Sequence, residues 1–206
     1  MSYRLAAREL LRDTLLDAAL ELLRERAWSE ITMADVAAAA GISRQTLYSE
    51  FGSRGEFAQA AVAREGGRFI AAAQETIAAH RDDPADALSR AFAEFLTAAA
   101  ANPLVQAIVA PDGDGTLLPL ITTQAGPLVE GVSAHLTQTL VTTWPQFMRR
   151  EARPLADCIV RLAISHAALP LHAPRRTASW VTALLAPYLE QALSAGPARR
   201  SSRSAA

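Results

Sequence analysis

The sequence predicts an all-α fold, and three observations support that prediction. Apolar residues recur every three to four positions over long stretches, which is the spacing of one face of a helix. No stretch alternates apolar and polar residues over enough positions to indicate a strand. The breaks between the periodic stretches contain Gly, Pro, Asn or Asp, which typically begin or end helices. We therefore expect about nine or ten helices.

The composition is that of a folded chain with a sizeable core. Half of the 206 residues are apolar and 20% are charged, and this length suits one large domain or two small ones. No apolar run approaches the roughly 18 residues that span a membrane, and the single Cys158 fits a reducing compartment. We expect a cytoplasmic protein with no membrane partner. Because the net charge is −1, any binding to DNA must depend on local arrangement.

Capping signals near the N-terminus predict three helices in quick succession. Helical spacing of leucines and alanines predicts the first over residues 5–26. Thr32, followed three residues later by Asp35, forms a variant of the capping box and predicts the start of a second helix. Gly41 is a typical stop for that helix. Ser43 can then cap a third helix of about two turns.

The third helix has an apolar face and a polar face. At about 100° per residue, Leu47 and Phe51 point inward. The side chains that point away or flank the opposite face are Arg44, Gln45, Thr46, Tyr48 and Ser49. Arginine can pair with guanine, glutamine with adenine, and hydroxyls with phosphate. Two short helices joined by a turn are typical of a helix-turn-helix module, whose later helix enters the major groove of DNA.

The segment ITMADVAAAAGISRQTLYSEFGSRGEF resembles the DNA-binding module of the TetR family of one-component bacterial regulators. The pattern T-x-x-x-V-A-x-x-A-G-x-S-x-x-T-L-Y-x-x-F-x-S-[KR] is intact from Thr32 to Arg54, and the resemblance covers about residues 10–62. Beyond that range the likeness is one of helix number and length. The resemblance implies phosphate contacts from Thr32, Ser43, Thr46, Tyr48 and Arg54, and base contacts from Arg44, Gln45 and Ser49.

Glu50 departs from the family pattern, which often has an aromatic residue at this place. Its carboxylate can accept a hydrogen bond from cytosine or pair with Arg54 one turn later, and we favour the ion pair. Acidic residues balance the arginines of this module, so it is not basic overall. The arm that carries Arg4, Arg8 and Arg12 is therefore the expected source of additional positive charge.

Capping and composition also suggest domain boundaries. We assign residues 1–53 to a helix-turn-helix DNA-binding domain and residues 54–195 to a larger helical-bundle domain for ligand binding and dimerisation. Ser53 and Glu56 form a capping box that begins the fourth, long helix. Residues 196–206 are polar and low in complexity, and we expect a disordered tail.

The last two amphipathic helices are expected to form the interface of a homodimer. Pro154 is expected to begin the first of them, and Pro187 to kink the second. The resemblance implies a four-helix bundle with two helices from each subunit, although an intramolecular core explains the same leucines. We favour the dimer. The expected interface residues are Leu155, Ile159, Leu162, His166, Val181, Leu184, Leu185 and Tyr188.

The middle of the chain contains helices broken by proline and glycine, and in the TetR family this region encloses a ligand cavity. An apolar lining with a few polar groups suits a lipophilic effector such as a fatty acid or ester. Plain core remains the better interpretation for any single leucine. The expected ligand-binding residues are Phe92, Phe95, Leu96, Ile108, Leu117, Leu120, Ile121, Leu128 and His135.

The sequence shows no catalytic constellation, so we expect no enzyme activity, no cofactor and no metal. Cys158 lies in an apolar pattern and is expected to be buried, and the four histidines lack metal-ligand spacing. The predicted function is a repressor that a lipophilic small molecule releases from a palindromic double-stranded DNA operator. The alternatives are an activator or co-repressor-dependent regulator of the same fold and, from another class, a helical protein-interaction module without DNA binding.

Overall fold

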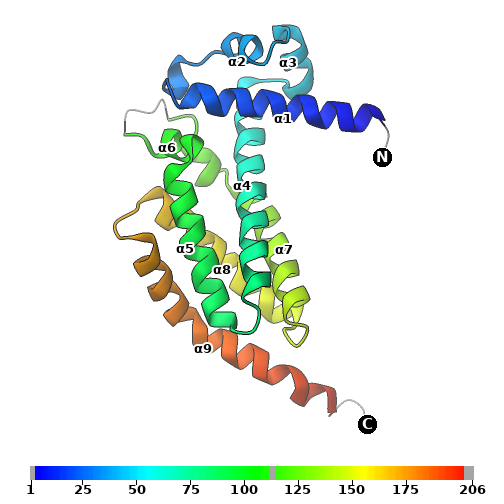
Figure 1. Ribbon diagram of the computed structural model, residues 1–206, viewed down its shortest axis with the longest axis vertical. Helices are drawn as coiled ribbons and strands as arrows, with labels where there is room; N and C mark the ends of the chain where they lie inside the picture. The colour runs from blue at the N-terminus through cyan, green and yellow to red at the C-terminus, as the bar shows by residue number, and fades with distance from the viewer. Residues whose placement is uncertain (1–2, 112–114, 202–206) are drawn as a thin grey trace. The chain divides into compact units, whose positions relative to one another are not determined.

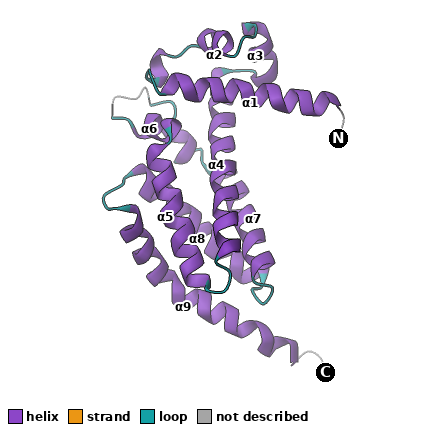
Figure 2. Cartoon of the chain, viewed as in Figure 1, coloured by secondary structure: helices purple, strands orange, loops and turns teal. Residues whose placement is uncertain are grey.

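The computed structural model describes residues 3–111 and 115–201, and within these ranges it contains helices and loops but no strand (Figure 2). The α-helices are α1 (Tyr3–Leu23), α2 (Met33–Ala39), α3 (Arg44–Phe51), α4 (Arg54–Ala79), α5 (Pro84–Ala101), α6 (Pro103–Val109), α7 (Gly126–Thr143), α8 (Arg149–Ala168) and α9 (Pro174–Ser201). Two 3₁₀ helices accompany them, η1 (Trp28–Glu30) and η2 (Leu118–Ile121). The predicted all-α class is confirmed.

The chain forms two compact units, which are described separately. Unit 1 comprises the described residues of Met1–Glu65 and Ala101–Gln124, and unit 2 those of Gly66–Ala100 and Ala125–Ala206. The boundary thus lies inside α4, whereas the sequence suggested a division after residue 53. Two packing features explain the difference, since α6 contacts α1 and the first turns of α4 are part of the core of unit 1.

Unit 1 contains α1, α2 and α3, which lie together in Figure 1 and share one core. Leu15 of α1, Leu47 of α3 and Phe57 of α4 are fully buried. The rings of Phe51 and Phe57 meet edge to face, with centroids 4.8 Å apart. Burial of a large apolar side chain contributes about 1.5–3 kcal/mol. The helix-turn-helix therefore depends on the beginning of α4 for its core.

Unit 2 is a helical bundle in which α7 packs along α8, and α8 packs against α9 (Figure 1). Leu140, Ala152 and Leu189 are buried in its main core cluster. At the N-terminal end of this unit an ideal Cβ added to Gly66 would lie 2.8 Å from Cδ1 of Leu128. A glycine at this position therefore permits the close approach of α7 to α4.

Two helix ends in unit 2 differ from the sequence predictions. Helix α8 begins at Arg149, so Pro154 lies inside it rather than at its start. The amides of Glu151 and Ala152 donate to the carbonyl of Met148, which begins the helix before the proline is reached. Helix α9 runs to Ser201, so residues 196–201 of the expected tail are helical, and the rest of that tail lies outside the described residues.

The length and apolar character of the helices bear on whether any of them could cross a membrane. No single helix in the described ranges is long and apolar enough to do so. Taken together, α5 and α6 meet those requirements as a bent pair, on length and composition alone.

Candidate nucleic-acid interface

Helix α2 begins at a complete capping box. The amide and the hydroxyl of Thr32 donate to Oδ2 of Asp35 at 2.8 and 2.7 Å, and the amide of Asp35 donates to Oγ1 of Thr32 at 3.2 Å. The hydrogen bonds from the side chain and then the backbone of Thr32 hold the pKa of the Asp35 carboxyl below its ordinary value. The capping box predicted from the sequence is confirmed.

Helix α3 is bounded by a side-chain cap and two glycines. Oγ of Ser43 accepts from the amide of Thr46 at 3.1 Å, as the sequence predicted. Gly41, before the helix, has φ +70°, and Gly52, after it, has φ +76°. A side chain at either angle would be strained, so these turns favour glycine. The amide of Gly52 donates to the carbonyl of Tyr48 at 2.8 Å and closes the last turn.

The two faces of α3 differ as the helical spacing predicted. Leu47 and Phe51 are buried beneath the helix, and the candidate base-contacting residues Arg44, Gln45 and Ser49 are exposed. Thr46 and Tyr48 are half-buried beside them. The guanidinium carbon of Arg44 lies 5.2 Å from the centroid of the Tyr48 ring, which favours one orientation of the arginine. The helix therefore presents hydrogen-bonding groups on one accessible side, over an apolar base.

Arg54 has a structural role that the sequence did not reveal. Its Nη2 donates to the carbonyl of Trp28, and its guanidinium lies 4.6 Å from the centroid of the Trp28 ring. These contacts hold the start of α4 against η1. The two residues are 26 positions apart, so no local spacing in the sequence indicated the pair.

Glu50 pairs with α1 and not with Arg54, so that prediction was wrong. Oε2 of Glu50 lies 2.7 Å from Nε of Arg8 and 4.0 Å from Nη1 of Arg12. Arg12 also donates to the carbonyl oxygen of Glu50 at 2.8 Å and lies 4.2 Å from the centroid of the Phe51 ring. Two of the three arginines expected to supply positive charge to DNA are therefore engaged by an acidic residue of α3.

A polar network joins α1, α4 and α6 within unit 1, and the sequence analysis missed it. Nη1 of Arg64 donates to the carbonyl of Asp13 at 2.9 Å, and Nη2 lies 3.0 Å from Oδ1 of Asp17. The next residue, Glu65, is 6% exposed and accepts from Nδ2 of Asn102 at 2.7 Å. Asn102 also accepts from two amides in the first turn of α6. The order Asn-Pro before an apolar run was the available signal for this N-cap.

Comparison with known proteins identifies the family. Residues 15–61 match the family described as "Bacterial regulatory proteins, tetR family", and residues 83–187 match "Bacterial Tetracyclin repressor, C-terminal domain". The chain is 38% identical over 189 residues to the HTH-type transcriptional regulator AlkX of Mycobacterium tuberculosis strain H37Rv, covering 92% of this chain and 90% of AlkX. The chain belongs to the TetR family. It is a transcriptional regulator of that family, as the resemblance predicted.

Solved structures of TetR-family proteins agree with this assignment. The repressor AlkX from Dietzia sp. strain DQ12-45-1b, implicated in biodegradation of n-alkanes, is 41% identical with a TM-score of 0.80, over 88% of this chain and 96% of that one. Thermus thermophilus FadR in complex with lauroyl-CoA shares the fold, at 20% identity and a TM-score of 0.57, over 84% of this chain and 92% of that one. The relatives named here are regulators rather than enzymes.

The expected ligand-binding residues of this TetR-family regulator are divided between the two units. In unit 1, Ile108, Leu117 and Leu120 are buried and Ile121 is half-buried; in unit 2, Phe92 and Leu96 are buried, Phe95 and Leu128 are half-buried, and His135 is exposed. Nδ1 of His135 lies 3.0 Å from the carbonyl of Gly131 on the same helix. The periodic pattern identified apolar positions but did not indicate which unit each one joins.

Unit 1 contains an open cleft of about 510 Å³. It is lined by residues 23–30 on one side and by members of 103–111 and 115–118 on the other. Ile108 and Leu117 are the two expected ligand-binding residues among its lining. Small-molecule pockets commonly have volumes of about 300–1,000 Å³, so the size of the cleft is compatible with a small ligand.

The expected dimerisation residues of α8 and α9 differ in exposure. Leu155 and Val181 are buried in core clusters of unit 2, so in this chain they stabilise its own bundle. Ile159, Leu162, His166 and Leu185 are half-buried, whereas Leu184 and Tyr188 are exposed. Sequence periodicity placed all eight on apolar faces but could not separate the core-facing positions from the exposed ones.

The structure also bears on Cys158, on His166 and on the possibility of a metal site. Cys158 is exposed, which corrects the expectation that it is buried. The ring of His166 meets that of Phe92 edge to face, with centroids 6.4 Å apart. Within residues 3–111 and 115–201, no group of three or more His, Cys, Asp and Glu side chains could hold a metal ion.

Proposed function

We propose that this TetR-family regulator is a repressor that binds a palindromic operator as a homodimer and leaves it when a lipophilic small molecule binds. The observation that carries the proposal is α3, where Arg44, Gln45 and Ser49 are exposed above buried Leu47 and Phe51. Caps at both ends hold this short helix in place. Such side chains match the hydrogen-bonding edges of bases in the major groove.

The homodimer is supported by an apolar stripe on α9. Trp180, Leu184 and Tyr188 follow one another at helical spacing, and all three are exposed in the single chain, Leu184 by 79%. Aromatic side chains are enriched at protein interfaces. Helix-turn-helix dimers read two half-sites about 34–36 Å apart, so a homodimer of this chain is expected to bind a palindromic operator.

A lipophilic effector is supported by the relatives. The Dietzia AlkX, at 41% identity, is implicated in biodegradation of n-alkanes. The residues expected to bind the effector are apolar except His135. Operator release requires only that the effector change DNA affinity by about 5- to 150-fold, a coupling free energy of about 1–3 kcal/mol.

The DNA-binding part of the proposal is tested by selecting duplexes from a random library with the purified protein. We expect enrichment of a palindrome, binding that weakens steeply with salt, and an altered base preference in Gln45→Ala. Gln59→Ala, at an exposed position of α4, is the matched control. Failure to enrich any duplex supports the helical interaction module instead, and an unaltered preference in Gln45→Ala excludes this residue as a base contact.

The dimer and the effector have their own measurements. Leu184→Glu is expected to sediment as a folded monomer, because replacing this exposed side chain leaves the core of unit 2 unchanged. If the variant sediments as the same dimer as wild type, the α9 stripe is excluded as the interface.

To test the effector, dodecanoate, lauroyl-CoA and dodecane are added to the operator complex. Release supports the repressor, whereas tighter binding supports the co-repressor-dependent alternative. If none changes affinity, the lipophilic effector is refuted.

A further inference from the structure

The ion pairs between α1 and α3 point to a role for Glu50, the one acidic residue in α3. We propose that Glu50 limits the binding of non-operator DNA by neutralising Arg8 and Arg12. This inference rests on the proposed DNA-binding function. It differs from both roles that the sequence suggested for Glu50, namely a contact to cytosine and a pair with Arg54.

The geometry places one carboxylate against two guanidinium groups. Oε2 of Glu50 lies 2.7 Å from Nε of Arg8 and 4.0 Å from Nη1 of Arg12. The Glu50 side chain is 17% exposed, whereas that of Arg8 is 58% exposed. The Glu50 side chain is thus largely shielded from solvent, and Arg8 remains accessible to a competing anion. A DNA phosphate is such an anion, and it competes with Glu50 for the charge of Arg8.

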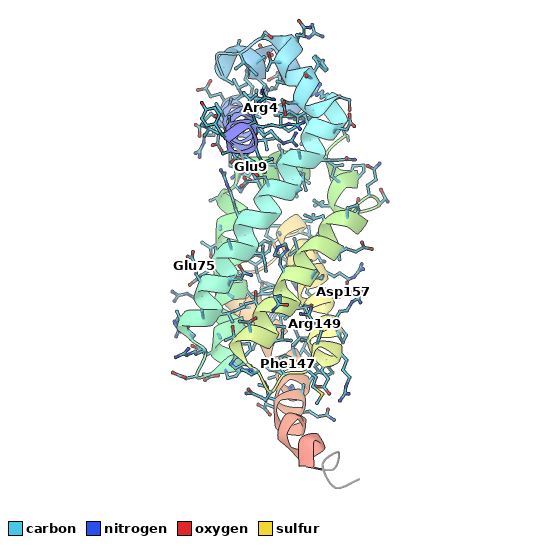
Figure 3. The ribbon with its side chains drawn as sticks, turned by 90° about the vertical axis from the view of Figure 1, so that its right-hand side faces the viewer. Arg4, Glu9, Glu75, Phe147, Arg149 and Asp157 are labelled. Carbon is cyan, nitrogen blue, oxygen red and sulfur yellow. The ribbon has the colours of Figure 1, made fainter. Side chains whose placement is uncertain are left out.

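Glu50 lies at the edge of the face that is expected to approach DNA. It follows Ser49 on α3, about 100° further around the helix, on the opposite flank from Arg44 and Tyr48. Arg8 and Arg12 contact this edge of α3 from α1. Figure 3 labels Arg4 and Glu9 on α1, which is viewed nearly along its axis.

Neutralised arginines affect the two kinds of DNA complex differently. Binding to non-operator DNA depends almost entirely on phosphate contacts, whereas binding to an operator also uses contacts to bases. A carboxylate that occupies two arginines therefore removes a larger share of the total binding free energy from the non-operator complex. The net charge of −1 means that the chain has little other excess positive charge to replace them.

Removing the charge of Glu50 should leave α3 in place. Arg12 also donates to the carbonyl oxygen of Glu50 at 2.8 Å and lies over the ring of Phe51. Both contacts are independent of the carboxylate. Glu50→Gln has nearly the same shape, so it tests the charge rather than the fold, and its melting temperature checks this directly.

The experiment measures affinity by fluorescence anisotropy over a range of salt, on a random-sequence duplex and on a selected operator. In Glu50→Gln the plot of log affinity against log salt for the random duplex is expected to be steeper, by about 0.9 for each arginine released. The affinity of Glu50→Gln for the random duplex is expected to rise several-fold. Glu9→Gln, which removes an exposed carboxylate from α1, is the matched control.

Arg8→Gln provides the second test, in the wild-type and the Glu50→Gln backgrounds. We expect little change in the salt slope when Glu50 is present and a loss of about 0.9 when it is absent. A loss of about 0.9 in the wild-type background overturns the proposal, whether or not Glu50→Gln folds. Equal slopes for Glu50→Gln and Glu9→Gln also overturn it. Absence of DNA binding by the wild type refutes the proposed function instead.

Discussion

Asn102 offers a quantitative test of how α6 is held within unit 1. Its Oδ1 accepts from the amides of Leu104 and Val105 at 2.9 and 3.2 Å, and its Nδ2 donates to Glu65 at 2.7 Å. Replacement by alanine removes both the cap of α6 and the hydrogen bond to Glu65. Loss of an N-cap costs about 1 kcal/mol. Loss of a hydrogen bond to a charged group costs about 1.5–3 kcal/mol. Asn102→Ala is therefore expected to lower the free energy of unfolding by about 2.5–4 kcal/mol.

Two further substitutions separate the cap from the bond to Glu65. Asn102→Ser can still cap α6 but cannot provide the amide donor, so it is expected to lose only about 1.5–3 kcal/mol. Asn102→Asp keeps the cap and places a carboxylate against the buried carboxylate of Glu65, so it should destabilise more than serine. Ser53→Ala is the control, because the Ser53 hydroxyl accepts from the amide of Glu56 at 3.1 Å.

The measurement is urea denaturation followed by circular dichroism. Protein concentration must be held constant, because the proposed dimerisation would make apparent stability depend on it. The slope of free energy against urea should be the same for all variants, so that midpoints report stability alone. If Asn102→Ser is as stable as wild type, or if Asn102→Ala loses no more than Ser53→Ala, the bond to Glu65 contributes nothing and the reasoning is refuted.

Three other substitutions test the backbone of α4 and the cap of α2. Gly66→Ala is expected to destabilise by about 1–3 kcal/mol, because the added Cβ would lie 2.8 Å from Leu128. Its neighbour Gly67 has nothing within 4 Å, so Gly67→Ala should stabilise by about 0.5–1 kcal/mol; equal effects in thermal melts would contradict this packing. The folded-state pKa of Asp35 is lowered, so its stabilisation is present at neutral pH and is lost as pH falls through that pKa. Below about pH 4, unfolding of Asp35→Asn should therefore depend less on pH than that of wild type, and parallel pH profiles would exclude the carboxylate as the cause.

Features that depend on neighbouring residues in the sequence were predicted well. Thr32 and Ser43 cap the helices that follow them, and Gly52 ends α3 at a positive φ. Each of these features is set by hydrogen bonds or backbone angles within four residues. The helical spacing that correctly predicted a buried Leu47 and an exposed Gln45 is equally local. One sequence contains all the information that such features require.

Contacts between distant residues were not predicted, and Glu50 shows why. The sequence favoured Arg54, four residues away, because that spacing brings side chains together on any helix. In the structure Arg54 lies over Trp28, and Glu50 binds Arg8 across 42 positions. Whether a charged residue meets a local or a distant partner depends on how helices cross. Periodicity does not determine that crossing.

The same limit applies to the boundary between the domains. Residues 101–124 lie within the range that matches the C-terminal domain of the family, 83–187, yet those of them that the structure describes fold with unit 1. Their contacts run from α6 to α1, and from Asn102 to Glu65 of α4. Chain order assigns this segment to the regulatory region, whereas packing assigns it to the unit that carries α3. Any displacement of α6 would therefore act directly on the packing of the unit that carries α3, with no intermediate element required.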